Sequence, residues 1–158
     1  SVKKGTSITK KDAISGNIPV IGGGTKSAYT HNIHNRDAGV ITISASGANA
    51  GFVNYHDYEI FASDCNTIQH SDKELLKYVY YYLQWKQNDI YKFARGTAQP
   101  HFYEPQIYRL MVPFPDDRQI ISTIVKSCTE IDLDETKKEE YKLKEKRKVI
   151  EKLLDIRS

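Results

Sequence analysis

The chain has 158 residues, 39% of them hydrophobic, and a formal net charge of +3, so its length fits one domain or one small domain with an appendage. No apolar run approaches the roughly 18 residues that a membrane-spanning helix needs, and no signal peptide is visible, which predicts a cytoplasmic protein without membrane contact. The two cysteines, Cys65 and Cys128, form no CxxC motif, which argues against zinc and disulfide frameworks and predicts two free thiols in a reducing compartment.

Charge is divided unevenly along the chain. Residues 1–115 contain 12 Lys and Arg against 9 Asp and Glu, whereas residues 116–158 contain 11 of each. A net charge of +3 is ordinary for a soluble domain and favours a nucleic-acid partner only weakly. The chain opens with Ser1 and its only methionine is Met111, so we expect it to be a piece of a longer protein.

The first third of the chain predicts short strands and one long loop. Residues 1–17 are polar and indicate an exposed entry segment, and residues 18–21 form a short apolar strand. The three glycines at 22–24 allow positive φ and close backbone approach. The polar stretch 25–35 has no period, so we expect a long loop, which is where function tends to lie on a small scaffold.

The next segment predicts more strands. Residues 39–44 are rich in β-branched side chains, and residues 45–51 form a turn of small residues. Residues 52–55 and 58–62 resemble the two strands of a hairpin, and residues 66–69 add another strand. Short, closely spaced strands favour a mixed, mainly antiparallel sheet, and the helices that follow make the expected class α+β.

A helix is predicted from Ser71 to about Ile90. Ser71 and Glu74 match a capping box, with Ser71 at the N-cap. We expect the aromatic side chains of this helix to pack in a core. The alternative, a base-stacking platform, is less favoured because such platforms usually present their rings on a sheet or groove. The aromatic side chains are Tyr78, Tyr80, Tyr81, Tyr82 and Trp85.

The stretch from residue 93 to residue 115 divides the chain into two kinds of sequence. It combines a predicted loop at 95–100 with a predicted strand at 106–112, which Pro113 and Pro115 close. Arginine suits guanine, and Asn or Gln suits adenine, each through two hydrogen bonds to the base edge. The loop is therefore a candidate for reading DNA, and an ordinary surface loop remains the alternative.

Residues 116 to about 157 contain neither Gly nor Pro, which predicts one long helix of about 60 Å at 1.5 Å per residue. Its middle, 135–148, is almost wholly charged, so its stability must come from packing the apolar ends. We favour an antiparallel helical partner, and a charged tail that frays is the alternative. The predicted pairing residues are Ile121, Ile124, Cys128, Ile131, Val149, Leu153 and Ile156.

One catalytic pattern lies partly within this helix. Asp116, Glu135 and Lys137 match the skeleton of a magnesium-dependent nuclease, in which two carboxylates converge on the metal beside a lysine. Glu135 and Lys137 stand two residues apart in the predicted helix, where they point in different directions. We therefore expect no catalytic residue and no divalent cation here.

Three further motifs are too incomplete to indicate a catalytic, metal or nucleotide site. Residues 44–47 lack the Gly-x-Ser-x-Gly turn of a nucleophilic serine. His31 and His34 have no cysteine or carboxylate cluster beside them. Residues 22–26 lack phosphate-loop spacing, although Lys26 could hold a DNA phosphate. We predict no metal and no cofactor.

The order of these segments resembles a known family. IPVIGGG is followed by GVITISASGANAGFVNYHDYEIFASDCNTI, by the 71–90 helix, by ARGTAQPHFYEPQIYRLMVPFP and by a long helix. This order resembles the specificity (S) subunit of type I restriction-modification systems over nearly the whole chain. The GTAQP loop, with its Pro-x-Pro leading into a Gln-Ile helix, is the most specific element.

The resemblance implies a non-catalytic protein with two parts. Residues 1–115 would be a target recognition domain that reads one half of a bipartite double-stranded DNA sequence, and residues 116–158 a helical spacer. Family members hold modification (methyltransferase) subunits and, through them, the restriction subunit. The family usually has two recognition domains and two helices per chain, so this chain would be an excised half or a half-sized subunit that forms a homodimer.

Two other classes remain open, a coiled-coil interaction protein that ignores DNA and a small magnesium-dependent nuclease. Arg95 and Gln99 are the candidates for base readout and Lys26 for a phosphate contact. The complete set of predicted DNA-binding residues is Lys26, Tyr29, His31, Asn32, Ser46, Asn49, Arg95, Thr97, Gln99, His101 and Tyr103.

Overall fold

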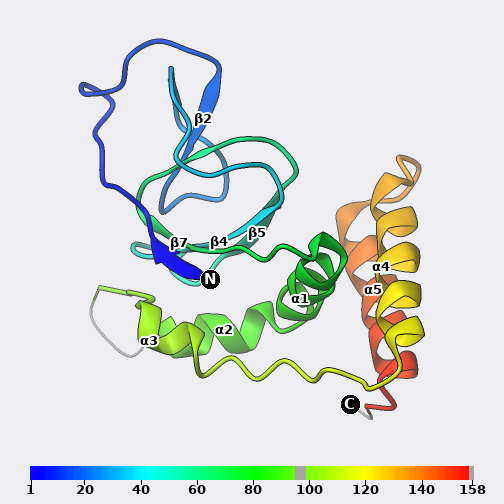
Figure 1. Cartoon of the computed structure of the whole chain (residues 1–158). Coiled ribbons are helices and arrows are strands. Elements are labelled where there is room, and N and C mark those ends of the chain that lie inside the picture. The colour runs from blue at the N-terminus through cyan, green and yellow to red at the C-terminus, as the bar shows by residue number, and fades with distance from the viewer. Residues whose placement is uncertain (95–98, 157–158) are drawn as a thin grey trace.

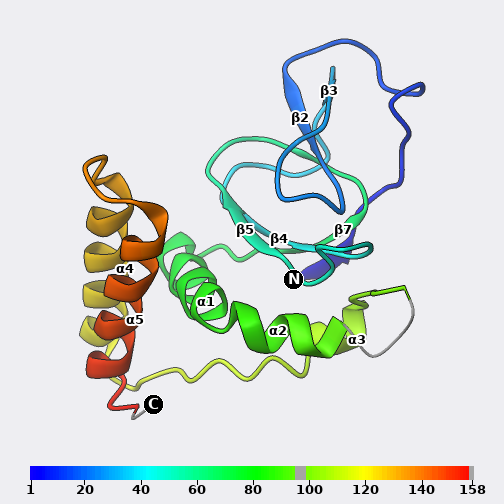
Figure 2. The same cartoon turned by 180° about the vertical axis from the view of Figure 1, so that it is seen from behind.

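A computed structural model of the chain describes residues 1–94 and 99–156. A four-stranded sheet lies between a layer of helices and a smaller three-stranded sheet (Figures 1 and 2). The strands are β1 (Val2–Lys4), β2 (Ile18–Ile21), β3 (Thr30–His31), β4 (Val40–Ser44), β5 (Val53–His56), β6 (Phe61–Ala62) and β7 (Cys65–Ile68). The helices are α1 (Lys73–Trp85), α2 (Gln87–Ala94), α3 (Glu104–Ile107), α4 (Arg118–Leu133) and α5 (Glu139–Leu153).

The larger sheet has the order β1-β7-β4-β5, and every neighbouring pair is antiparallel. Successive side chains of a strand point to opposite faces, and β4 uses both. Ile41 and Ile43 pack into a core with Leu76 and Leu83 of α1. The alternate residues of β4 therefore face the smaller sheet.

The smaller sheet has the order β3-β2-β6, with β2 antiparallel to β3 and parallel to β6. The α+β class with mixed, mainly antiparallel sheets is confirmed. The predicted hairpin of residues 52–55 and 58–62 is wrong, because β5 pairs with β4 whereas β6 pairs with β2. Residues 57–60 instead carry the chain from one sheet to the other, and Ile60 is fully buried there.

Helix α1 begins one residue later than predicted, since the Asp72 carboxylate accepts a hydrogen bond from the Leu75 backbone N–H at 2.9 Å. The chain turns at Lys86 and continues as α2. Tyr78, Tyr81 and Tyr82 are buried in a second core that α1 shares with α4 and α5. For these three rings the core interpretation is confirmed.

The strand predicted at residues 106–112 is wrong, because helix α3 occupies its start. The Gln106 side-chain oxygen accepts a hydrogen bond from the Tyr103 backbone N–H, and Pro105 lies in the first turn. Both features are typical of a helix N-terminus. The segment from Tyr108 to Pro115 then runs beneath α2 without joining either sheet (Figure 1).

The single long helix predicted for residues 116–158 is also wrong. Helices α4 and α5 lie side by side as an antiparallel hairpin (Figures 1 and 2). The turn is built on Asp134, whose carboxylate accepts hydrogen bonds from the Thr136 backbone N–H at 3.1 Å and the Thr136 hydroxyl at 2.6 Å. Such local bonds from an Asp side chain compete with helical ones, so the chain reverses without Gly or Pro.

The predicted pairing residues pack inside the chain. Ile121, Ile124 and Cys128 are buried in the core beside the α1 tyrosines, and Val149, Leu153 and Ile156 pack against the same cluster. Ile131 lies outside that cluster. Within the described residues, the antiparallel contact predicted with a second helix is therefore made between α4 and α5.

A buried lysine fastens this hairpin to α1. Lys146 is 4% exposed, and its ammonium group donates hydrogen bonds to Asp132 at 2.6 Å and to the Gln84 side-chain oxygen at 2.7 Å. It also lies 5.5 Å from the centroid of the Tyr81 ring. Because a buried charge is tolerated only with partners, these contacts fix how α5 seats on α1 and α4.

The cysteines and the helix lengths bear on the cellular surroundings expected from the sequence. Cys65 and Cys128 are free and buried, and burial raises the pKa of each thiol to about 12. Among the helices that the structure describes, none has the length and apolar character needed to cross a membrane.

We predict that Lys146→Ala destabilises the chain by about 2–3 kcal/mol, because it leaves Asp132 and Gln84 without their partner. This is less than the 3–5 kcal/mol of a fully buried pair, since Asp132 is 35% exposed. Urea unfolding followed by circular dichroism measures the loss. Lys144→Ala is the matched control, because Lys144 pairs with Glu140 on the exposed face of the same helix and should cost about 0.5 kcal/mol or less. Equal effects of the two variants would contradict a fastening role for Lys146.

Candidate nucleic-acid interface

The small-residue turn and the segment after the main loop are joined by backbone hydrogen bonds. The Gly47 N–H donates to the Pro100 carbonyl at 3.1 Å, and the Phe102 N–H donates to the Ala45 carbonyl at 2.8 Å. Gly47 has φ +79°, a conformation that favours glycine. The chain therefore brings residues 44–49 and 99–103 to one edge of the larger sheet.

The glycine run after β2 reaches the same edge. A Cβ atom at Gly23 would lie 2.9 Å from the Ser46 carbonyl oxygen, so only glycine fits this close approach. The Ser46 hydroxyl in turn donates a hydrogen bond to the Asp64 carboxylate. The close backbone approach predicted for the glycine run is confirmed at Gly23, and three predicted segments meet here.

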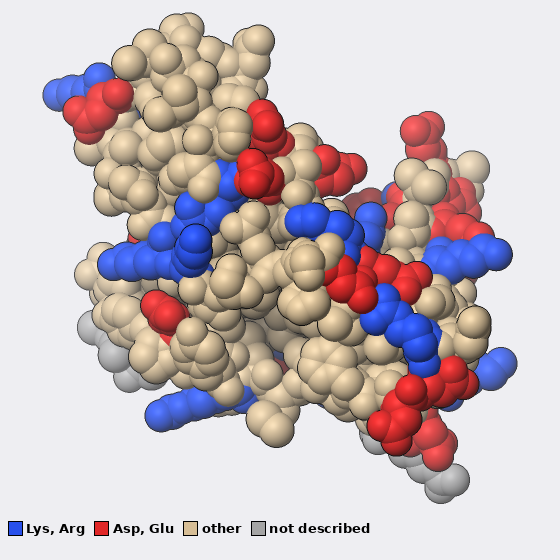
Figure 3. Space-filling model, in the orientation of Figure 1, with Lys and Arg blue, Asp and Glu red and all other residues tan. Residues whose placement is uncertain are grey.

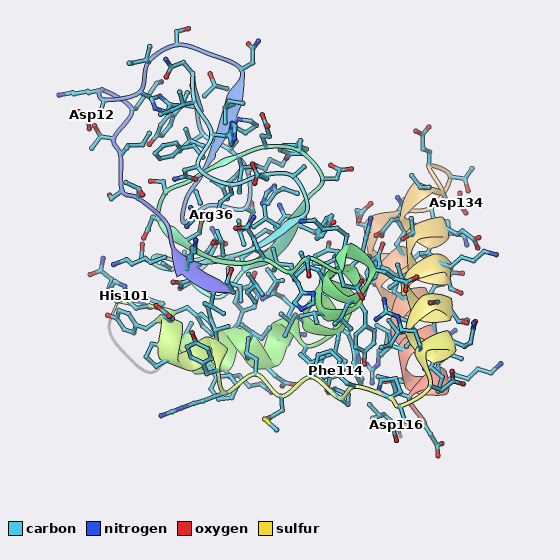
Figure 4. The ribbon with its side chains drawn as sticks, viewed as in Figure 1. Asp12, Arg36, His101, Phe114, Asp116 and Asp134 are labelled. Atoms are coloured by element: carbon cyan, nitrogen blue, oxygen red, sulfur yellow. The ribbon has the colours of Figure 1, made fainter. Side chains whose placement is uncertain are left out.

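A buried ring anchors the last of these segments. Phe102 is 1% exposed, and its carbonyl accepts a hydrogen bond from the Asn66 side-chain amide at 2.9 Å. On either side of it, the rings of His101 and Tyr103 stack with centroids 5.4 Å apart and an angle of 18° between their planes (His101 is labelled in Figure 4). Tyr103 is 61% exposed, so the anchor holds a planar aromatic pair at the surface.

The first predicted loop divides into exposed and engaged residues. Lys26 and Asn32 are exposed. The Tyr29 hydroxyl donates to the Ile8 carbonyl at 2.8 Å. His31 is 7% exposed, and its Nδ1 accepts from the Ile14 N–H at 3.0 Å. Tyr29 and His31 thus hold the N-terminal segment against the loop, and we leave them out of the DNA contacts proposed below.

The remaining predicted residues are placed as follows. Ser46 and Asn49 are partly exposed, and the Asn49 carbonyl accepts from the Phe52 N–H within the turn. Gln99 is exposed next to Pro100. Arg95 and Thr97 lie outside the described residues.

Charge follows the division seen in the sequence. On the face shown in Figure 3, basic and acidic side chains are interspersed over α4 and α5. Along α5, Lys144 pairs with Glu140 and Arg147 with Glu151. The basic excess thus belongs to the part of the chain that carries the strands.

The nuclease pattern is not assembled. Asp116 lies at one end of α4, whereas Asp134, the neighbour of Glu135, lies at the other (Figure 4). Sixteen helical residues separate them by about 24 Å. Lys137 bonds to Glu145 at 2.7 Å instead.

His31 and His34 do not converge either. Of the residues described, three potential metal ligands meet only at His34, Asp37 and Glu59, and all three are exposed. His34 lies 3.4 Å from each carboxylate, a spacing that ordinary surface contacts explain. The expectation that His34 has no carboxylates beside it is therefore wrong, and the absence of a metal stays a prediction.

Sequence reasoning missed a polar cavity behind the first loop. Thr42, Ser44 and His56 are buried and line a cavity of about 250 Å³. Thr42 Oγ1 and His56 Nε2 share a hydrogen bond of 2.9 Å. Burial lowers the pKa of His56 to about 4, despite the opposing charge of Asp57. The sequence did contain a signal for this cavity. Thr42 and Ser44 stand two residues apart in β4, so they mark one polar face of the strand.

An α+β domain that gathers polar and aromatic side chains from three segments at one sheet edge is suited to contacting a nucleic acid. The sequence matches the family described as type I restriction modification DNA specificity domain over residues 1–143. The chain belongs to this family. Membership assigns it to the non-catalytic specificity part of such a system and confirms the resemblance drawn from the sequence.

A solved structure agrees with this fold. The S subunit of the type I restriction-modification system from M. genitalium superposes with a TM-score of 0.74 at 24% sequence identity, over 84% of this chain. The match covers 36% of that subunit's own length. A search of curated proteins found no match.

We predict that His56 makes the chain less stable as the pH falls from about 6.5 to about 4. The unfolded chain binds a proton near pH 6.5, whereas the folded chain resists it until about pH 4, so protonation favours unfolding within this window. The loss should approach about 3 kcal/mol at about 1.4 kcal/mol per pKa unit. Urea unfolding across this pH range should show a smaller loss in His56→Gln. Equal pH dependence in both proteins would contradict the low pKa of His56.

Proposed function

We propose that the chain reads one half of a bipartite double-stranded DNA sequence. The observation that carries this proposal is the meeting of residues 22–26, 44–49 and 99–103 at one sheet edge. These segments come from distant parts of the chain and present amide, hydroxyl, imidazole and phenol groups. Such groups bind base edges and phosphates, and the family is one of DNA specificity.

Within this interface, each residue has a role set by its chemistry. Gln99 and, outside the described residues, Arg95 are the candidates for base edges, and Lys26 is the candidate for a phosphate. The stacked pair of His101 and Tyr103 offers a planar surface and two polar edges. Ser46, Asn49 and, outside the described residues, Thr97 complete the proposed contacts at this edge. Asn32 follows β3, whose His31 pairs with Ile18 at the opposite end of β2 from the glycine run, so it would contact DNA apart from this edge.

The proposal includes partners. A specificity domain needs other subunits for chemistry, so we propose that the chain docks methyltransferase subunits and, through them, a restriction subunit, in the cytoplasm. The proposed division assigns residues 1–115 to recognition and residues 116–158 to spacing. This spacing part is the hairpin of α4 and α5, whose core is continuous with α1.

We predict that Gln99→Ala, in the complex with methyltransferase subunits, lowers the preference for the correct half-site by about 5- to 150-fold, the equivalent of one bidentate base contact of about 1–3 kcal/mol. Lys26→Ala should instead weaken all sequences alike and reduce the salt slope by about 1. Fluorescence anisotropy with target and scrambled duplexes at several salt concentrations separates the two effects. Unchanged preference in Gln99→Ala would show that this side chain reads no base.

A bipartite target has two half-sites, so it needs two DNA-contacting sheet edges of the kind proposed here. The chain matches about a third of the S subunit to which it is similar. We propose that a second unit, either a copy of this chain or another half of a longer subunit, supplies the other edge. Large apolar side chains on the hairpin support this, since Leu133, Tyr141 and Leu143 are 74%, 64% and 46% exposed. A two-fold symmetric pair would read two inverted half-sites at a fixed spacing.

We predict that the chain forms dimers in sedimentation equilibrium, and that the double variant Tyr141→Lys with Leu143→Lys is monomeric at the same concentration. Tyr141 and Leu143 point to different sides of α5, so the two added charges oppose association through either side of the hairpin. Met111→Lys is the control, because Met111 is 83% exposed but lies on the extended segment beneath α2. A monomer at every concentration of the unmodified chain would rule out self-association as the source of the second edge.

A further inference from the structure

The cavity of about 250 Å³ behind the first loop has a polar floor. Thr42, Ser44 and His56 are 2%, 3% and 1% exposed, yet all three are polar. Thr42 bonds to His56 at 2.9 Å, His56 Nδ1 contacts the Tyr58 hydroxyl at 3.4 Å, and the Ser44 hydroxyl donates to the Gly22 carbonyl at 3.3 Å. A hydroxyl has one donor and two acceptor positions, so each retains capacity directed at the cavity.

The walls add aromatic rings and an amide. Phe52 and Tyr58 both line the cavity, and Tyr58 is 49% exposed. Its ring meets that of His56 edge-on, with centroids 5.6 Å apart. The Asn54 side-chain oxygen accepts from the Tyr55 N–H at 2.9 Å, which leaves the amide nitrogen of Asn54 to donate to a ligand.

Charge and size restrict what this cavity accepts. Of its described lining residues, Lys26 alone carries a charge, and His56 is neutral above pH 4. The volume equals that of about eight water molecules and lies just below the roughly 300–1,000 Å³ of pockets for drug-sized ligands. A neutral heterocycle of one or two rings fits these limits, and the exposed lysine suits an attached phosphate.

We propose that this cavity binds a nucleobase, with Phe52 and Tyr58 as its stacking surfaces, Thr42, Ser44 and Asn54 as its hydrogen-bond partners, and Lys26 as the contact for the attached phosphate. Extruded bases are held elsewhere by this combination of stacking and edge hydrogen bonds. The source we favour, a base extruded from the target duplex, rests on the proposed function. A free mononucleotide presents the same chemistry, and the experiment separates the two.

The source is tested with 2-aminopurine, whose fluorescence rises when it leaves the base stack, placed at successive positions of the target duplex in the complex with methyltransferase subunits. In parallel, the chain alone is titrated with the four nucleoside monophosphates while NMR follows the His56 ring protons. Tyr58→Ala should lower the affinity of the cavity for the base about tenfold or more, as loss of one stacking contact does. Both the fluorescence rise and the shift of the His56 signals should fall accordingly. Tyr58→Phe should retain it, and so should Tyr108→Ala, which removes another exposed tyrosine ring elsewhere on the chain.

A fluorescence rise that Tyr58→Ala abolishes identifies an extruded base. Movement of the His56 signals by a nucleotide, with the same pattern among the variants and no such fluorescence rise, identifies a free nucleotide. A complex that binds its target but shows neither response, or only a rise that survives Tyr58→Ala, overturns the cavity proposal and leaves the proposed function intact. A complex that does not bind DNA overturns the proposed function, and the titration alone then decides for or against the cavity.

Discussion

The structure depends on one helix that is buried on two opposite faces. Helix α1 sends Leu76 and Leu83 into the core under the larger sheet, and Tyr78 and Tyr81 into the core beneath the hairpin. A helix that is apolar on both sides is stable only inside protein, so α4 and α5 must cover the second face. Lys146 then selects one seating of the hairpin, because its charge can be buried only where Asp132 and Gln84 meet it.

The edge proposed to read DNA is tied to the same interior. Phe102 packs in one cluster with Leu83 of α1 and Ile90 of α2, so the stacked rings of His101 and Tyr103 keep their place relative to the hairpin. Packed interiors transmit displacement because they have few voids to absorb it. The distance between two reading edges would therefore be set by how the hairpin packs on α1, and not by the length of a free rod of about 60 Å.

The sequence was sufficient wherever local pattern decides the structure. Strand β2 was found from its apolar run and β4 from its β-branched residues. The start of α1 was found to within one residue, from a capping pattern that names Ser71 in place of the actual cap, Asp72. It was insufficient where distant contacts decide. The reversal at Asp134 is favoured because α1 offers an apolar face to both α4 and α5, and no residue of the 116–158 segment reports that face. The sheet edge where the three loop segments meet was likewise not predictable. Each segment was identified from the sequence, but the close approach of Gly23 to Ser46 depends on tertiary packing.

The two faces of strand β4 differ in chemistry. Its side chains alternate, so Ile41 and Ile43 face α1 and build the core, whereas Thr42 and Ser44 face the cavity. Apolar residues at these two positions would avoid the cost of burying hydroxyl groups, and His56 adds a further cost below pH 6.5 because it resists protonation. The cavity face of β4 therefore lowers stability, whereas the face toward α1 provides it. This separation of roles is expected when a rigid scaffold carries a binding site. Under the proposed function, the polar face of β4 would belong to the recognition surface together with the loops at the sheet edge.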